Sequence, residues 1–310
     1  MGALTPDPSP RRLGKSDLSV GPIAYGCWRF AGTDVAAARE KIETALELGM
    51  TLVDTADIYG CDSGQGVGAA ESLLGEVLAD APALRGRMVL ATKAGIVPGT
   101  PYDSSAAHLR EACEASLRRL RTDTLDLYQI HRPDLLAHPA EVAATLAELR
   151  QAGKIREVGV SNHTAAQFDA LQAHLPFAVA THQPELSALC LDPLRDGVLD
   201  QCLRTGATPL AWSPLAGGRL GLDAREARAR PEGPRLAPLV EGLEALARAR
   251  GVPRSAVALA FLMVHPAGVI PIVGSQRTER IRECAQATRV ELGRGEWYGL
   301  VEASLGEKLP

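Results

Sequence analysis

The sequence contains no apolar run of about 18 residues, the length that a membrane-spanning helix requires. Its first residues, MGALTPDPSPRRLGKSD, are polar and proline-rich, and they lack the apolar core of a secretory signal peptide. We therefore expect a cytoplasmic protein that makes no membrane contact and has a loose N-terminal arm over residues 1–20.

Patterns typical of metal sites and disulfide frameworks are missing as well. The six cysteines are scattered along 310 residues without a CxxC pair, so we expect reduced thiols. The seven histidines show neither HExxH nor HxH spacing, which argues against a metal site. A net charge of −4 gives no sign of a basic surface for nucleic acid, and no nucleic-acid partner is expected.

What the sequence does contain is a regular alternation of short apolar runs and longer amphipathic segments. Hydrophobic residues make up 46% of the chain, enough for a large core. Near-continuous apolar runs are typical of parallel strands buried on both faces. The runs are IAYG (23–26), TLVDTA (51–56), MVLATK (88–93), LDLYQIH (125–131), REVGVSN (156–162), AVATHQ (178–183), TPLAWS (208–213) and GVIPIVG (268–274).

Helical patterns follow these runs, and the first begins near a possible N-cap at Thr33 or Asp34 and stops at Gly49. The predicted helices span 34–48, 69–78, 105–120, 139–151, 164–173, 196–204, 237–250, 254–264 and 277–287.

Eight strands alternating with helices predict an α/β protein, a (β/α)8 TIM barrel that forms a single domain over residues 1–310. A doubly wound sheet is the alternative, and the absence of GxGxxG after the first strand weakens it. The stretch 216–235 is long for a connection, and we expect it over the mouth of the barrel.

Polar residues collect at the predicted strand ends, where TIM barrels carry their active sites. Asp54 ends the second strand and Tyr59 follows it, while Lys93 ends the third strand and His131 the fourth. The next three strands end with Ser161, Asn162, Gln183 and Ser213. Each residue alone has a structural explanation, such as a loop cap or a solvated strand end.

Together these residues have a chemical logic. Lys93 buried beside Asp54 would form an ion pair in which both charges survive. The lysine would lower the pKa of Tyr59 from about 10, so that the tyrosine acts as a general acid near neutral pH. A neutral His131 would then donate a hydrogen bond to a carbonyl oxygen.

In these residues the sequence resembles the aldo-keto reductase family. The matching motifs are DTADIYG (54–60), ATKAG (91–95), IHRPD (130–134), VGVSN (158–162), HQPE (182–185), WSPL (212–215) and IPIVGS (270–275). The resemblance extends from Gly26 to about Trp297, and WSPLAGGRL looks closest to a bacterial branch of single-chain oxidoreductases.

The resemblance implies hydride transfer from NADP(H) to an aldehyde or ketone carbonyl, with Tyr59 as the proton donor. It places Asp54 and Lys93 behind the tyrosine and His131 at the substrate carbonyl. The residues that it implies for cofactor binding are Trp28, Ser161, Asn162, Gln183, Trp212, Ser213, Pro214, Leu215, Gly217, Gly274, Ser275, Gln276, Arg277, Arg280 and Glu283.

The preference for NADPH over NADH depends on the last predicted helix. Arg277 and Arg280 share a face near its start, where backbone N–H groups and arginine forks favour a phosphate. The same arginines could instead pair with Glu279 and Glu283 on a solvated surface.

Two other functions stay open at this point. One is an NAD-preferring sugar or alcohol dehydrogenase that works in the oxidative direction. The other is a non-enzymatic, cofactor-sensing subunit like the channel-associated members of the fold. In each case we expect a small-molecule ligand and a monomer, with a homo-oligomer as the alternative.

Overall fold

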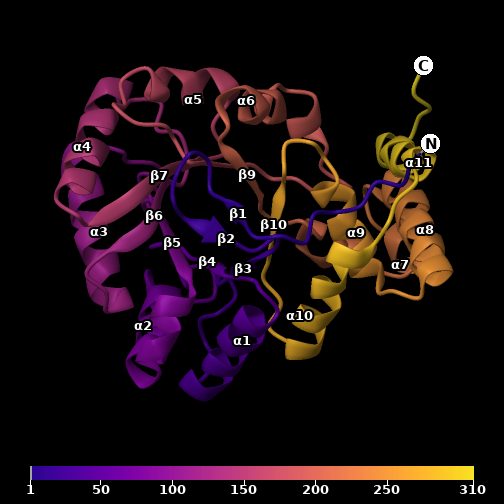
Figure 1. Ribbon diagram of the computed structural model, residues 1–310, viewed down its shortest axis with the longest axis horizontal. Coiled ribbons are helices and arrows are strands. Elements are labelled where there is room, and N and C mark those ends of the chain that lie inside the picture. The colour runs from indigo at the N-terminus through magenta and orange to yellow at the C-terminus, as the bar shows by residue number, and fades with distance from the viewer. Residues whose placement is uncertain (1) are drawn as a thin grey trace.

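The computed structural model describes residues 2–310 and confirms the predicted (β/α)8 barrel (Figure 1). Eight parallel strands close in the order β10-β3-β4-β5-β6-β7-β8-β9. Each predicted apolar run overlaps one of them. The strands are β3 (Ala24–Gly26), β4 (Leu52–Asp54), β5 (Val89–Ala94), β6 (Leu125–Ile130), β7 (Ile155–Ser161), β8 (Thr181–Gln183), β9 (Thr208–Ala211) and β10 (Ile270–Val273).

Helices surround the strands and bury their apolar faces against them (Figure 1). The predicted helices are observed as α1 (Val35–Glu47), α2 (Ala69–Asp80), α3 (Ala106–Leu120), α4 (Pro139–Gln151), α5 (Ala165–Gln172), α6 (Val198–Thr205), α8 (Gly233–Arg250), α9 (Arg254–Met263) and α10 (Thr278–Ala285). No helix in residues 2–310 combines the length and the apolar composition that a bilayer crossing requires.

Several helical elements were not predicted. Helix α8 begins at Gly233 rather than 237, because a proline in the first helical turn needs no N–H partner there. The stretch 216–235 therefore contains short helical segments and tight turns instead of one extended loop. The additional elements are α7 (Ala224–Arg228), α11 (Arg294–Leu305), η1 (Pro82–Arg87), η2 (Asp192–Leu194), η3 (Ala216–Gly221) and η4 (Gln286–Arg289).

The prediction of a loose N-terminal arm is wrong. Strands β1 (Arg11–Arg12) and β2 (Ser19–Val20) pair as an antiparallel hairpin, which lies across the centre of the barrel in Figure 1. Within this N-terminal plug, residues 11–20, Leu13 is fully buried. It belongs to one apolar cluster with residues that begin the barrel strands, such as Leu52 and Ile270. The plug therefore closes the amino-terminal end of the barrel and leaves the opposite end for chemistry.

The C-terminal helix α11 packs against α8 beside the barrel (Figure 1). Trp297 stacks on Phe261 with ring centroids 5.0 Å apart, and its Nε1 donates to the Phe261 carbonyl oxygen at 2.9 Å. Trp297 is thus a packing residue.

Replacing Leu13 with alanine should lower the free energy of unfolding by about 2–5 kcal/mol, because it leaves a cavity in the plug. Leu136 provides a matched control, since it is 97% exposed. Leu136→Ala should change the free energy of unfolding by less than about 0.5 kcal/mol. Guanidinium unfolding followed by circular dichroism measures both changes. If the plug does not stabilise the barrel, Leu13→Ala and Leu136→Ala should change the free energy of unfolding equally.

Candidate active site

The four residues predicted to act together meet at the carboxyl end of the barrel. Asp54 is the last residue of β4, Lys93 lies in β5, and His131 follows β6. Tyr59 lies in a turn after β4, where its N–H donates to the Ala56 carbonyl oxygen. The Lys93 side chain is completely buried and that of Asp54 nearly so. The strand ends therefore bring a buried ion pair against a partly buried phenol.

Lys93 is the centre of this arrangement. Its ammonium group donates to Asp54 Oδ2 at 2.7 Å, to the Thr55 carbonyl oxygen at 2.8 Å and to the Tyr59 hydroxyl at 3.0 Å. A lysine has three N–H donors, so all three are used. Because the Tyr59 oxygen accepts from Lys93, its own proton is left to point toward a substrate.

The pKa of Tyr59 differs from the prediction. Burial raises the pKa of the phenol above its ordinary value, while the positive charge of Lys93 only partly opposes this rise. The predicted lowering is therefore wrong in direction, although Lys93 acts in the predicted sense. The sequence indicated the neighbouring charge but not how far the fold buries the phenol. A tyrosine in this environment is protonated at neutral pH.

The charge states of Lys93 and His131 follow from the same geometry. Burial lowers the pKa of Lys93, but the attraction of Asp54 and Tyr59 outweighs burial and raises it, so the lysine stays charged. Burial, Lys93 and Arg132 together hold the pKa of His131 well below its usual range. Within residues 2–310 no partner reaches His131 Nδ1, so a proton on Nε2 avoids burying an unpaired N–H.

The three residues predicted to hold an amide lie beside this group. Ser161 Oγ donates to the Gln183 carbonyl oxygen at 2.8 Å, and Asn162 Nδ2 donates to Ser161 Oγ at 2.7 Å. Asn162 Oδ1 accepts from Trp212 Nε1 at 2.8 Å. Asn162 has a φ of 57°, an uncommon left-handed conformation for a residue other than glycine, and such strain is often found at functional sites.

This arrangement fits a carboxamide such as that of nicotinamide. The Gln183 amide nitrogen is held by Asp54 Oδ1 at 3.1 Å, while its Oε1 makes no hydrogen bond among residues 2–310. Oε1 of Gln183 and the second lone pair of Asn162 Oδ1 can accept the two N–H groups of a carboxamide. The Trp212 ring, fixed by Asn162, is half-buried next to them.

The loops after β9 and β10 contain the residues expected for the rest of the cofactor. After β9, Ser213 and Ala216 have left-handed φ values of 52°, and Ser213 Oγ accepts from the Gly217 N–H at 2.9 Å. This tight turn also includes Pro214 and Leu215. After β10, Tyr25 donates to the Ser275 carbonyl oxygen at 3.1 Å and so anchors the segment Gly274–Gln276.

Helix α10 begins without a side-chain cap, which leaves the N–H groups of its first turn open. The two arginines at this end are both paired. Arg277 Nε lies 3.7 Å from Glu279 Oε2, and Arg280 Nη1 lies 2.7 Å from Glu283 Oε2. These are the surface pairs named above as the alternative, so a phosphate here would have to compete with them. The role of these arginines in phosphate binding stays a prediction.

Trp28 lies at the rim of the site and is 49% exposed. Its Nε1 donates to Asp62 Oδ2 at 3.2 Å, and the Arg29 guanidinium lies 5.1 Å from its ring centroid. None of its recorded polar contacts reaches the catalytic set in the described chain, so a role at the cofactor stays a prediction.

Three residues near the site were not predicted. Gln129 of β6 donates to Asp54 Oδ1 at 3.2 Å. Arg132 lies 5.6 Å from the Trp212 ring centroid, and the Thr55 carbonyl oxygen accepts from Lys93. For Gln129 a signal was present, because an amide stands one residue before the end of the fully buried strand sequence LDLYQI.

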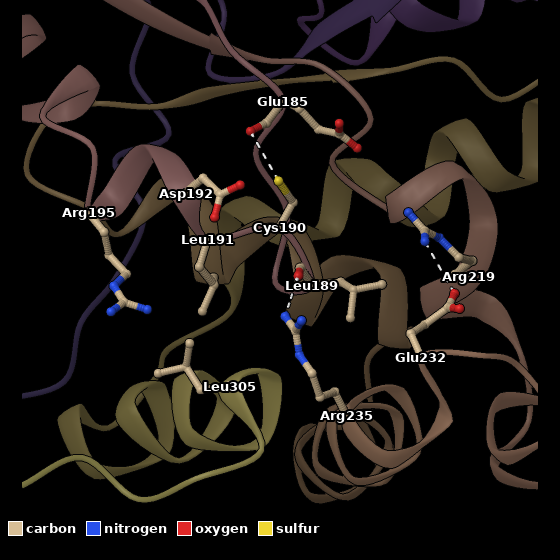
Figure 2. Close-up of a pocket in the computed structure, with 10 residues that line it drawn as sticks. All are labelled: Glu185, Leu189, Cys190, Leu191, Asp192, Arg195, Arg219, Glu232, Arg235 and Leu305. Atoms are coloured by element: carbon tan, nitrogen blue, oxygen red, sulfur yellow. Dashed lines mark hydrogen bonds and ion pairs between the residues drawn. The ribbon is translucent and has the colours of Figure 1, made fainter. Parts of the chain in front are cut away.

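A cavity of about 290 Å³ lies apart from this group, between the loop after β8, η3 and the helices α8 and α11 (Figure 2). Three of its six charged side chains are engaged with each other or with the backbone. Arg219 pairs with Glu232 at 3.2 Å, and Arg235 donates to the Leu189 carbonyl oxygen at 3.3 Å. None of the predicted site residues lines this cavity.

Comparison with known proteins gives a consistent result. A family model described as the Aldo/keto reductase family matches residues 22–303. A 6-dehydroglucose reductase of Novosphingobium aromaticivorans is 49% identical and covers 100% of both chains, and one of Agrobacterium fabrum is 37% identical over 96% of this chain and 99% of its own. The oxidoreductase YdhF of Escherichia coli is 38% identical over 93% of this chain and 95% of its own. The crystal structure of the thermostable aldo-keto reductase Tm1743 with the inhibitor epalrestat superimposes with a TM-score of 0.79 at 26% identity, covering 95% and 99% of the two chains.

Asp57 is a buried carboxyl group next to this site, with no hydrogen-bond partner for Oδ1 in residues 2–310. Burial and the charge of Glu71 raise its pKa to about 7. In the folded protein Asp57 therefore keeps its proton to a higher pH than in the unfolded chain. The resulting stabilisation is full at low pH and is lost as the pH rises through about 7.

Asp57→Asn should remove this pH dependence. Between pH 4.5 and 8 the wild type should lose roughly 1–3 kcal/mol more of its free energy of unfolding than the variant. Guanidinium unfolding at a series of pH values gives both curves. Parallel curves for the two proteins would show that Asp57 is ionised in the folded state over the whole range.

Proposed function

Since this chain belongs to the aldo/keto reductase family, it is an oxidoreductase that reduces carbonyl groups with a nicotinamide cofactor, and we propose NADPH as that cofactor and Tyr59 as the general acid. The observation that carries the proposal is the position of Lys93 Nζ, which lies 2.7 Å from Asp54 Oδ2 and 3.0 Å from the Tyr59 hydroxyl. This contact leaves the phenolic proton of Tyr59 available to a substrate oxygen.

The reaction places negative charge on the carbonyl oxygen, and the chain supplies two groups to receive it. Bound NADPH supplies the hydride. Tyr59 transfers its proton to the oxygen, and Lys93 stabilises the phenolate that remains. His131, held neutral by its surroundings, donates a hydrogen bond that orients the same oxygen. The resting protonation of Tyr59 suits the reductive direction, because an oxidising enzyme would need the phenolate at the start.

We infer the substrate from the names of similar proteins. Two of them, 49% and 37% identical to this chain, are named 6-dehydroglucose reductase. That compound carries an aldehyde at C6 of glucose, a carbonyl of the class that this site serves.

The choice of NADPH rests on Arg277 and Arg280 at the start of α10. Their pairs with Glu279 and Glu283 are exposed, and exposed ion pairs contribute little stability. A 2′-phosphate carries a greater charge than a carboxylate and can also accept from the open N–H groups of the helix. It would therefore compete well for both guanidinium groups.

A cytoplasmic location and a monomeric state stay predictions.

The proposed function is tested by turnover of purified protein with NADPH and 6-dehydroglucose or simpler aldehydes. Tyr59→Phe should lower kcat by about 10²–10⁴-fold, because the general acid is lost, while the Kd for NADPH changes less than about twofold. Lys93→Met should have the same effect on kcat, since it removes the charge that stabilises the phenolate. Wild-type turnover no greater than that of Tyr59→Phe would sink the proposal.

Arg280→Ala should raise the Kd for NADPH by about tenfold or more and leave that for NADH unchanged, because only NADPH carries the phosphate. Fluorescence titration with each cofactor measures this difference. Arg282→Ala on the same helix is a matched control, with an exposed arginine that is not expected to contact the phosphate. A preference for NADH in the wild type, unaffected by either substitution, would favour the oxidative sugar or alcohol dehydrogenase instead.

A further inference from the structure

We propose that Gln129 is a positioning residue that couples the cofactor-binding amide of Gln183 to the Asp54–Lys93 ion pair. This inference rests on the function proposed above and assigns a role to a side chain in the barrel interior. Gln129 is fully buried in β6, directly beside Lys93 in the register of the sheet. A buried primary amide is unfavourable unless its donors and acceptor are satisfied, so its partners define its purpose.

The partners of Gln129 belong to both halves of the site. Its Nε2 donates to Asp54 Oδ1 at 3.2 Å. Its Oε1 accepts from Gln183 Nε2 at 3.4 Å and from Thr181 Oγ1 at 3.2 Å. Gln183 Nε2 also donates to the same Asp54 oxygen at 3.1 Å. Asp54, Gln129 and Gln183 therefore form a closed triangle of hydrogen bonds behind Lys93.

Asp54 fixes which way the Gln129 amide faces. A carboxylate can only accept, so Gln129 Nε2 faces Asp54 and Oε1 is left to accept from the Thr181 hydroxyl. In the flipped orientation an amide oxygen would lie against the carboxylate, and two acceptors would repel each other. The hydroxyl of Thr181 in β8 thus satisfies the acceptor of a side chain from β6.

Gly159 of β7, between these two strands, makes this contact possible. A Cβ atom at Gly159 would lie 2.1 Å from Thr181 Oγ1 and 2.9 Å from Gln129 Cγ. The absence of a side chain therefore lets Gln129 reach across β7 to β8. The backbone of Gly159 has no left-handed φ, so space is the reason for glycine here.

The triangle determines how Gln183 meets the cofactor. With Nε2 held by Asp54 and Gln129, Gln183 must present Oε1 outward, where it can accept an N–H of the carboxamide. The amides of Gln129 and Gln183 both donate to Asp54 Oδ1. They thereby hold the carboxylate in the position in which Oδ2 binds Lys93. Gln129 thereby aligns the hydride donor and the proton donor through one carboxylate.

The experiment is Gln129→Met, which keeps the shape of the side chain and removes its donors and acceptor. We expect a rise of about tenfold in the Kd for NADPH and a fall in kcat of about tenfold or more, because both sides of the site lose a fixed partner. Thr181→Val, which removes only the hydroxyl that donates to Gln129 Oε1, should shift both quantities in the same direction by a smaller factor. In a double-mutant cycle, the variant that combines Gln129→Met with Gln183→Met should raise the Kd for NADPH by less than the product of the factors measured for the two single variants.

Gln201→Met is the matched control, a buried glutamine that binds His182 and Asp169 on the outside of the barrel. It should lower Tm and leave kcat and the NADPH Kd unchanged. If Gln129→Met lowers Tm in the same way but keeps wild-type kcat and Kd, Gln129 is only structural and the inference is overturned. If Gln129→Met does not fold, Thr181→Val decides the question through the same two quantities. Failure of the proposed function would look different, because the wild type itself would then lack NADPH binding or turnover.

Discussion

The buried ion pair between Lys93 and Asp54 is the interaction on which the rest of the site depends. Two charges removed from water are stable only if the remaining donors and acceptors around them are satisfied. Lys93 meets this condition with the Thr55 carbonyl oxygen and the Tyr59 hydroxyl, and Asp54 meets it with the amides of Gln129 and Gln183. The groups that make the pair tolerable are also the groups that position the proton and the cofactor. The side chains that stabilise the charged interior are therefore the same ones that set the geometry of the site.

This dual use explains why the site is built from strands rather than from loops alone. The register places Lys93 beside Gln129, Gln129 beside Gly159, and Gly159 beside Thr181, so one layer of the barrel fixes the network. A hydrogen-bonded sheet holds such a layer to within a few tenths of an ångström, which catalytic geometry needs. Tyr59 and His131, which must face a substrate, come from the first turns beyond the strands.

The barrel and the catalytic positions could be predicted from the sequence because both depend on local pattern. Strands such as β6 are buried on both faces and read as apolar runs, and their polar last residues indicate the mouth. Other features depend on contacts between distant segments. The plug escaped prediction because β1 and β2 have two residues each, too few to show a period. The direction of the Tyr59 pKa shift was missed because burial is a property of the whole fold, and the hydrogen-bond partners of Gln129 lie on two other strands, β4 and β8.

The barrel interior is apolar at its amino-terminal end and charged at its carboxyl end. The first end stabilises the fold, and the second holds the catalytic residues. At the amino-terminal end, residues such as Leu13, Leu52 and Ile270 form an apolar cluster. At the carboxyl end, the interior residues are Asp54 and Lys93 with their amide neighbours, which contribute little apolar burial. The hydrophobic free energy gained at the closed end therefore has to offset the cost of the charged network at the open end. A plug that buries apolar side chains at one end therefore contributes to the stability that a buried ion pair at the other end requires.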